Sequence, residues 1–237
     1  MATAIVTGAA RGLGEAIARR LHADGFRVLL ADVDVEGAER VAVELGGPAE
    51  VVEHDVRSLE SWEALAAQAG DVDALVNNAA RTVVRPFFEI PLDEWDDVLA
   101  TNLRGTYLGI RVVGAAMRDR GSGRIVNLSS VAGQNSRAVT GVHYASSKAA
   151  IVALTRHAAT ELASSGVTVN AVAPAAIDGP MAASVPPERL AAMLQTIPVG
   201  RLGRPEEVAA LVSFLVSPDA GFATGATFDL NGGMLMR

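Results

Sequence analysis

The sequence predicts a doubly wound α/β fold in which helices cover both faces of a seven-stranded parallel sheet. Short runs rich in Val, Ile and Leu alternate with longer segments whose apolar residues recur every three or four positions, a pattern typical of repeated βαβ units. Most of the short runs are too apolar to leave either face in water, so both faces need helices. The 237 residues contain no low-complexity linker and no repeat at solenoid spacing, so we expect a single domain over residues 1–237.

The predicted elements follow one another in regular order. Strands are expected at residues 4–6, 27–31, 50–53, 74–76, 124–128, 167–172 and 227–230, and helices at residues 13–23, 36–45, 59–67, 92–118, 144–164 and 206–215. Segment 177–203 follows the sixth strand and contains four prolines and a short helical stretch at 188–195. Because loops at the carboxyl ends of parallel strands build the binding site, we expect this segment to be a substrate lid; the alternative is a packed surface excursion.

Composition excludes several classes of function. The chain has 27 acidic and 20 basic residues, a net charge of −7 and no basic run, so we expect neither nucleic acid nor a membrane as a partner. There is no cysteine, and the four histidines lack metal-ligand spacing, so no metal site is expected. The first residues show no signal-peptide pattern, which makes the cytoplasm the expected location.

A glycine-rich turn between the first strand and the first helix predicts a dinucleotide site. Glycines stand at positions 8, 12 and 14, with Arg11 and Leu13 between them. Gly8, Gly12 and Gly14 let the backbone turn sharply and approach a ligand, and the helix that opens there presents free N–H groups to a pyrophosphate. A purely structural turn would also explain the glycines, but their position between strand and helix favours binding.

Asp32 at the end of the second strand predicts which cofactor is bound. It stands 18 residues after Gly14, close to the offset of about 20 expected for the acid that binds the adenosine ribose. A carboxylate there repels a 2′-phosphate, so NAD is favoured over NADP, although Arg11 could reach such a phosphate and points the other way. Asp34 is an alternative ribose acid, or a residue that caps the second helix.

Further motifs occur along the whole chain, and together they resemble those of the classical short-chain dehydrogenase/reductase family. In the family's order the sequence carries Asp55-Val56, Asn77-Asn78-Ala79, Asn102, Ser129-Ser130, Tyr144-x-x-x-Lys148, Asn170-x-Val-x-Pro174 and Asn231-Gly232-Gly233. The resemblance implies a Rossmann-type fold, an NAD(P) cofactor and hydride transfer between nicotinamide and a secondary alcohol or ketone. It also implies a homotetramer or homodimer.

Four residues form the expected catalytic set. Tyr144 and Lys148 are four residues apart and so share one helix face, where the ammonium and an oxidised nicotinamide would lower the pKa of the phenol and make it a usable acid or base. Ser130 follows the fifth strand, where its hydroxyl could hydrogen-bond the substrate oxygen, and Ser129 is the competing choice. By the resemblance the second serine of the pair is the catalytic one; it precedes Tyr144 by 14 residues, one more than is usual in the family, which a one-residue loop insertion would explain. The resemblance gives Asn102 the role of bending its helix and holding a water that links the lysine to solvent.

The resemblance also assigns the remaining contacts to cofactor and substrate. Lys148 is expected to hydrogen-bond the nicotinamide ribose. The other expected cofactor contacts are Asp55 and Val56 at the adenine, Asn78 and Ala79 on the path to the nicotinamide, and Pro174 and Ile177 after the sixth strand. Substrate candidates are Ser130, Tyr144 and Gln134, and Asn135 and His143 are further polar candidates for the pocket.

The sequence departs from the family pattern at a few positions. Ala80 and Ala175 stand where the family has glycine, and each adds a methyl group near the cofactor, a mild intrusion where φ is negative. Gly179 replaces a threonine that commonly hydrogen-bonds the nicotinamide carboxamide, and Asn231 replaces an aspartate. The interpretation is therefore an alcohol dehydrogenase or ketone reductase; the alternatives are an NADPH-dependent 3-oxoacyl-thioester reductase and a non-catalytic dinucleotide-binding scaffold.

Overall fold

The computed structural model contains one seven-stranded sheet with the strand order β3-β2-β1-β4-β5-β6-β7, and every neighbouring pair is parallel. The structure describes residues 1–135, 140–183, 185 and 187–236. The strands are β1 (Thr3–Thr7), β2 (Arg27–Asp32), β3 (Ala49–Glu53), β4 (Ala74–Asn77), β5 (Gly123–Leu128), β6 (Val167–Pro174) and β7 (Thr227–Leu230). All seven predicted strands occur, and the last has the predicted bounds.

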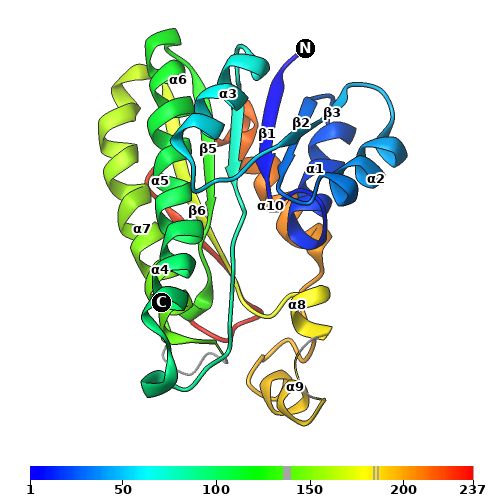
Figure 1. Ribbon diagram of the computed structural model, residues 1–237, viewed down its shortest axis with the longest axis vertical. Coiled ribbons are helices and arrows are strands. Elements are labelled where there is room, and N and C mark those ends of the chain that lie inside the picture. The colour runs from blue at the N-terminus through cyan, green and yellow to red at the C-terminus, as the bar shows by residue number, and fades with distance from the viewer. Residues whose placement is uncertain (136–139, 184, 186, 237) are drawn as a thin grey trace.

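The helices lie in two layers on opposite faces of the sheet (Figure 1). One layer contains α1 (Gly12–Ala23), α2 (Val35–Leu45) and α10 (Pro205–Val216); the other contains α3 (Leu59–Ala69), a long composite helix over residues 92–120, and α7 (Val142–Leu162). Strand residues alternate between the two layers, so that Ile5 packs with the second layer while Ala4 and Val6 pack with the first. This arrangement confirms the predicted doubly wound fold.

The long helix predicted at 92–118 is present but is not α-helical throughout. It consists of α4 (Leu92–Leu99), the π-helical turn η2 (Ala100–Arg104), α5 (Gly105–Gly109), a second π turn η3 (Ile110–Gly114) and α6 (Ala115–Arg120). The hydroxyl of Thr106 donates to the Asn102 carbonyl over 2.8 Å, within the first of these irregular turns. Apolar periodicity cannot distinguish such a turn from regular helix, because the buried stripe continues through it.

The carboxyl ends of the strands lie at one edge of the sheet, and the irregular segments gather there (Figure 1). The strand order reverses between β1 and β4, which places a crevice for ligands at this edge. Two short helices, α8 (Pro180–Ala183) and α9 (Pro187–Leu194), lie beyond this edge. The remaining turns are the 3-10 helices η1 (Phe87–Glu89), η4 (Val131–Gly133), η5 (Ala163–Ser165) and η6 (Pro218–Ala220). None of the described helices is both long and apolar enough to cross a bilayer.

Candidate active site

The glycine turn between β1 and α1 forms a cradle of exposed backbone. Gly8 and Gly12 have φ values of +66° and +60°, which only glycine adopts without strain. A Cβ on Gly8 would lie 2.9 Å from the Cα of Ala79, and one on Gly14 would collide with the Gly8 carbonyl oxygen. Among the described residues no side chain caps the start of α1, so its first N–H groups point freely out of the turn. These features fit a pyrophosphate, the group that the sequence predicts here.

Residues after β4 brace this turn from the neighbouring strand. The side-chain nitrogen of Asn78 donates to the carbonyl oxygens of Thr7 and Gly8 over 2.9 and 3.1 Å. The Thr7 hydroxyl in turn accepts the backbone N–H groups of Asn78 and Ala79 over 3.0 and 3.1 Å. Asn78 and Ala79 were predicted to line the path to the nicotinamide, whereas Thr7, which stands directly before Gly8, was missed. The two strands on either side of the crevice are thus tied together at the turn.

Asp32 and Asp34 have different surroundings at the end of β2. The two oxygens of Asp32 accept the backbone N–H groups of Ala10 and Asp34 over 2.9 and 3.0 Å, and each oxygen keeps a lone pair for a further donor. Asp34 accepts the N–H of Gly37 over 3.0 Å and caps α2, which is one of the roles that the sequence left open for it. Arg11 is exposed, and its Nη1 lies 3.9 Å from a carboxylate oxygen of Asp34. Arg11, the cation that the sequence suggested for a 2′-phosphate, therefore lies beside a carboxylate.

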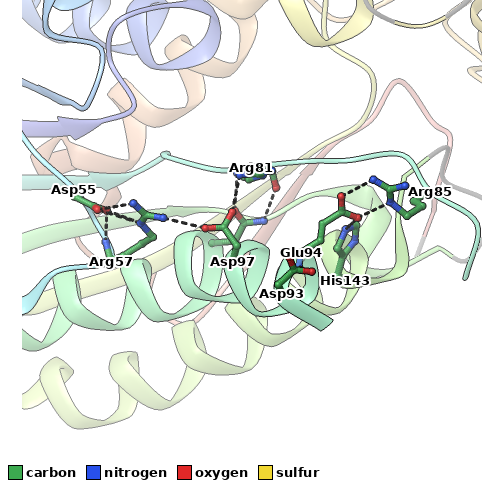
Figure 2. Close-up of polar contacts among 9 residues, drawn as sticks. Asp55, Arg57, Arg81, Arg85, Asp93, Glu94, Asp97 and His143 are labelled. Atoms are coloured by element: carbon green, nitrogen blue, oxygen red, sulfur yellow. Dashed lines mark hydrogen bonds and ion pairs between the residues drawn. The ribbon is translucent and has the colours of Figure 1, made fainter. Parts of the chain in front are cut away.

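The loops after β3 and β4 are joined through one residue of α4 (Figure 2). Arg57 donates hydrogen bonds from its Nε and Nη2 to the carboxylate of Asp55, and these bonds hold the pKa of Asp55 below its ordinary value. The Nη1 of Arg57 reaches Asp97 over 2.9 Å, and Arg81 reaches the other oxygen of Asp97 over 2.7 Å. Asp97 and the two arginines were missed by sequence analysis, because their ion pairs join residues far apart in the chain, 40 positions for Arg57 and Asp97.

Tyr144 and Lys148 lie together on the first two turns of α7, and both are buried. The Lys148 ammonium lies 5.5 Å from the centroid of the Tyr144 ring and donates to the Leu128 carbonyl over 2.6 Å. Burial lowers the pKa of Lys148 to about 7. Burial also raises the pKa of Tyr144, and a hydrogen bond with Ser130 opposes this rise. Desolvation outweighs this hydrogen bond, so the phenol keeps its proton here; the lowering expected from Lys148 together with an oxidised nicotinamide stays a prediction.

The two serines after β5 have different hydrogen-bond partners. The hydroxyl of Ser129 donates to the carbonyl oxygen of Lys148 over 2.8 Å and so faces the helix backbone. Ser130 begins the turn η4, where its oxygen accepts the N–H of Ala132 over 3.1 Å, and it also contacts Tyr144. Of the two serines, Ser130 is thus the one beside the phenol. Pro174 ends β6 next to it, and the Ser130 hydroxyl lies 3.5 Å from the Pro174 carbonyl oxygen.

Asn102 lies in the π turn η2 and is completely buried. Its side chain accepts the Arg81 N–H over 2.7 Å and donates to the Arg81 carbonyl over 3.0 Å, as a neighbouring strand would. The same amide donates to the Ser147 hydroxyl over 3.0 Å, and that hydroxyl donates to the Tyr144 carbonyl over 2.7 Å. Asn102 therefore connects the loop after β4 to the backbone of the helix that carries Tyr144.

The other predicted positions fall around this centre. Val56 is buried, and its carbonyl accepts the Trp62 indole N–H over 3.0 Å. Gln134 donates to Asp229 over 3.1 Å. His143, a further candidate for the pocket, is completely buried, with its ring stacked on Trp95 and its Nε2 3.4 Å from a carboxylate oxygen of Glu94 on α4. Residues 136–139, between the candidates Asn135 and His143, lie outside the described part of the chain.

The departures from the family pattern are accommodated by the backbone. No residue other than glycine has a positive φ in the described parts of the chain, so the methyl groups of Ala80 and Ala175 cause no backbone strain. Gly179 has a φ of +141°, which favours glycine over threonine. Asn231 accepts the Gly233 N–H over 2.9 Å and shapes the turn after β7. Within the described residues no group of three or more His, Asp or Glu side chains is placed to hold a metal ion.

Comparisons with known proteins agree with this arrangement. Residues 8–235 match a family model described as enoyl-(acyl carrier protein) reductase. An acetoacetyl-CoA reductase from Rhizobium meliloti is 43% identical over 97% of both chains, and a 3-oxoacyl-[acyl-carrier-protein] reductase FabG from Vibrio harveyi is 39% identical over 98% of this chain and 97% of its own.

Solved structures give the same result. A crystal structure of a 3-oxoacyl-[acyl-carrier protein] reductase from Brucella melitensis superposes with a TM-score of 0.94 at 36% identity, over 100% of this chain and 92% of its own. A second Brucella melitensis structure, described as such a reductase with bound NAD, has a TM-score of 0.93 at 35% identity over the same shares. The chain is a nicotinamide-dependent oxidoreductase, and it belongs to the short-chain dehydrogenase/reductase family.

Proposed function

We propose that the protein reduces 3-oxoacyl thioesters to 3-hydroxyacyl thioesters, with NADH as the preferred hydride donor. The observation that carries this proposal is the grouping of Ser130, Tyr144 and Lys148 at the carboxyl ends of β5 and β6, beside the glycine cradle. Relatives at 39% and 43% identity are described as reductases of 3-oxoacyl-[acyl-carrier-protein] and acetoacetyl-CoA, and each spans nearly the whole chain. The substrate is thus a ketone, as the sequence led us to expect, but one carried on a thioester.

The side chains of the site supply the proton that the reduction needs. A nicotinamide cofactor, when bound, would supply the hydride to the ketone carbon, and negative charge would then develop on the ketone oxygen. Tyr144 transfers its phenolic proton to that oxygen, so the product is an alcohol and the phenol becomes phenolate. Ser130 donates a hydrogen bond to the same oxygen as negative charge develops there. The raised pKa of Tyr144 suits this direction, because the phenol carries its proton at neutral pH.

Lys148 supports the phenolate and holds the cofactor. Its pKa of about 7 lets it switch between charged and neutral forms near physiological pH, so it can attract the phenolate and take part in returning a proton to it. Asn102 and Ser147 continue the line of polar groups from the helix toward the loop after β4. The family resemblance places the nicotinamide ribose on Lys148 and Tyr144.

Asp32 supports NADH as the cofactor. Its two oxygens can still each accept a ribose hydroxyl, while the Asp32 and Asp34 carboxylates repel a 2′-phosphate, and Arg11 is drawn toward Asp34. The Brucella melitensis reductase with bound NAD supports this preference, because it pairs the same substrate class with the same cofactor. We also assign Gly8, Gly12, Gly14 and Leu13 to the pyrophosphate.

The segment 177–203 is proposed as the substrate lid. Its two ends are held together: Ile177 forms a β-bridge with Gly203, and Asp178 donates its N–H to the Gly203 carbonyl over 2.8 Å. A cavity of about 320 Å³ separates this neck from the end of β7 and is lined by residues that include Ile177 and Leu230. This neck holds both ends of the segment that carries α8 and α9 at the carboxyl edge of the sheet.

Self-association and location complete the proposal. We propose a homotetramer or homodimer, as the family resemblance implies, acting in the cytoplasm. Tyr107 on α5, Phe214 on α10 and Phe222 after η6 are large apolar residues left exposed by a single chain, and burial against a second copy would stabilise an assembly.

A substrate panel tests the proposed function. The purified protein is supplied with NADH or NADPH and with acetoacetyl-CoA, a 3-oxoacyl thioester of longer chain, or simple ketones of matched size. The proposal predicts oxidation of NADH with both thioesters at a kcat/KM at least about tenfold above that for the ketones, since the thioester end adds binding energy. Equal rates with the simple ketones would favour a general ketone reductase, and NADPH as the better donor would refute the role of Asp32.

A further inference from the structure

His143 is a buried ionisable residue that the proposed chemistry does not use. It stands directly before Tyr144 in the first turn of α7, and its side chain is completely buried. Its Nδ1 accepts the backbone N–H of Tyr144 over 3.0 Å. The first N–H groups of a helix lack partners within the helix, and the N-cap residue Gly141 has no side chain to supply one. The imidazole therefore takes the place of a cap at the residue that carries the phenol.

The second ring nitrogen faces the composite helix across the interface (Figure 2). Because Nδ1 accepts, the proton of the neutral ring is on Nε2, which lies 3.4 Å from a carboxylate oxygen of Glu94 on α4. Arg85 binds that carboxylate with two hydrogen bonds of 2.9 Å, and the indole of Trp95 stacks on the imidazole at 6.4 Å between centroids. The ring is thus fixed from both sides.

The backbone at Gly141 packs closely against the His143 ring. A Cβ on Gly141 would clash with the imidazole and would lie 2.6 Å from the Val83 carbonyl oxygen. That same carbonyl accepts the Gly141 N–H over 3.2 Å, which attaches the start of α7 to the segment after β4. Val83 and Arg85 both belong to that segment. The start of α7 and the carboxylate that faces His143 are therefore both bound to the segment after β4.

We propose that His143 is a positioning residue: through Glu94 and Arg85 it fixes the first turn of α7 and thereby the direction of the Tyr144 hydroxyl. This inference rests on the proposed reaction, in which that hydroxyl delivers the proton. A shift of about 1 Å in a reacting group can cost on the order of a hundredfold in rate. The residues proposed for the pyrophosphate and the adenine lie on other elements, so the loss should fall mainly on kcat.

The test compares three substitutions on the same helix. His143→Leu removes both contacts of the ring, and we expect it to lower kcat for acetoacetyl-CoA reduction by about tenfold or more while the KM for NADH changes less than about twofold. His143→Asn keeps a carbonyl oxygen that can cap the helix and an amide that can face Glu94, so it should restore much of kcat. His157→Leu is the matched control, because His157 is exposed on the outer face of α7.

A spectroscopic measurement makes the result independent of the substrate. The chain has two tyrosines, so Tyr107→Phe leaves Tyr144 as the only one. Protein made with tyrosine labelled at one ring carbon then gives a single resonance, that of Tyr144. His143→Leu in this background should move or split that resonance and change its titration with pH, while His143→Asn should bring it back. If the unmodified protein reduced no thioester, the proposed function would fail, whereas the resonance would still test the positioning role.

Two outcomes would overturn the proposal. One is a His143→Leu protein whose kcat and Tyr144 resonance match those of the unmodified chain. The other is a loss of cofactor affinity as large as the loss of kcat, which would indicate general loosening of the fold. If His143→Leu does not fold, Glu94→Gln replaces it: the charge facing Nε2 is removed with little change in volume, and kcat should fall by about threefold with the same KM.

Discussion

Burial changes the pKa of one residue of the site, Lys148. The ammonium has the Leu128 carbonyl as a hydrogen-bond acceptor, and its pKa falls to about 7 because the charged form loses its hydration. In the unfolded chain the same lysine binds its proton up to its ordinary pKa of about 10.4. Between these two values the unfolded state therefore holds more protons than the folded state.

This difference predicts how stability depends on pH. Between pH 7 and 10 the contribution of Lys148 to the free energy of unfolding rises with pH, by at most about 1.4 kcal/mol per unit, the limit for one proton. Lys148→Met should abolish activity and remove this part of the rise. Urea unfolding of both proteins at several pH values checks it. Parallel pH curves for the two proteins would show that Lys148 is charged when folded.

Asp32 is the residue expected to set the preference for NADH over NADPH. Asp32→Ala should reduce the preference for NADH over NADPH by about tenfold or more, because both the ribose acceptor and the charge that repels a 2′-phosphate are lost. Kd values for the two cofactors, measured by nicotinamide fluorescence, test this. Asp34→Asn is the comparison: an asparagine can still cap α2, and loss of this second charge should change the ratio in the same direction but less than Asp32→Ala does. A larger effect at Asp34 than at Asp32 would reverse the assignment.

The composite helix from α4 to α6 connects the two loops proposed to bind the cofactor, one after β3 and one after β4. Asp97 receives Arg57 from the loop after β3 and Arg81 from the loop after β4, and Asn102, five residues later, clamps the backbone of Arg81. The loops expected at the adenine and at the nicotinamide are therefore held by a single helix. Partly exposed ion pairs are each worth about 0.2–1 kcal/mol, so the effect of breaking the two pairs that share Asp97 is modest.

Asp97→Asn tests this connection. We expect the KM for NADH to rise by about two- to tenfold while kcat changes less than twofold, because the loops loosen but the catalytic side chains stay in place. The effect should shrink at high salt, where the ion pairs in the unmodified protein are screened. Asp119→Asn, which removes the exposed pair with Arg118 on α6, should leave both constants unchanged. Equal changes in the two variants would contradict the connection.

Sequence patterns predicted the elements well but not the irregular turns and the charged contacts between them. The parallel strands could be found because both of their faces are buried, which leaves continuous apolar runs such as β6. The π turns could not be predicted from periodicity, because the buried stripe continues through them, and contacts such as that of Asn102 with Arg81 join residues 21 apart in sequence. Likewise His143 was a pocket candidate as the end of the stretch that begins at Gln134, and only the fold shows that its ring stacks on Trp95 of α4.

At the scale of the whole molecule, a net charge of −7 and exposed aromatic side chains bear on the proposed assembly. Phe222 is fully exposed in the single chain, and Phe214 and Tyr107 are about half exposed. Phe222→Ser should shift the protein toward smaller species in sedimentation velocity and lower its Tm, because the apolar area it would bury between copies is lost. A variant with unchanged mass and Tm would show that Phe222 lies outside any interface.

The central claim is that Tyr144 delivers the proton to a 3-oxoacyl thioester, and one comparison tests it most directly. NADH-dependent reduction of acetoacetyl-CoA is measured for the unmodified protein, for Tyr144→Phe and for Tyr107→Phe, which removes the other tyrosine hydroxyl of the chain from the outer face of α5. We predict that Tyr144→Phe loses between about a hundredfold and ten-thousandfold in kcat while still binding NADH, and that Tyr107→Phe keeps full activity. Comparable rates for Tyr144→Phe and the unmodified protein would contradict the claim.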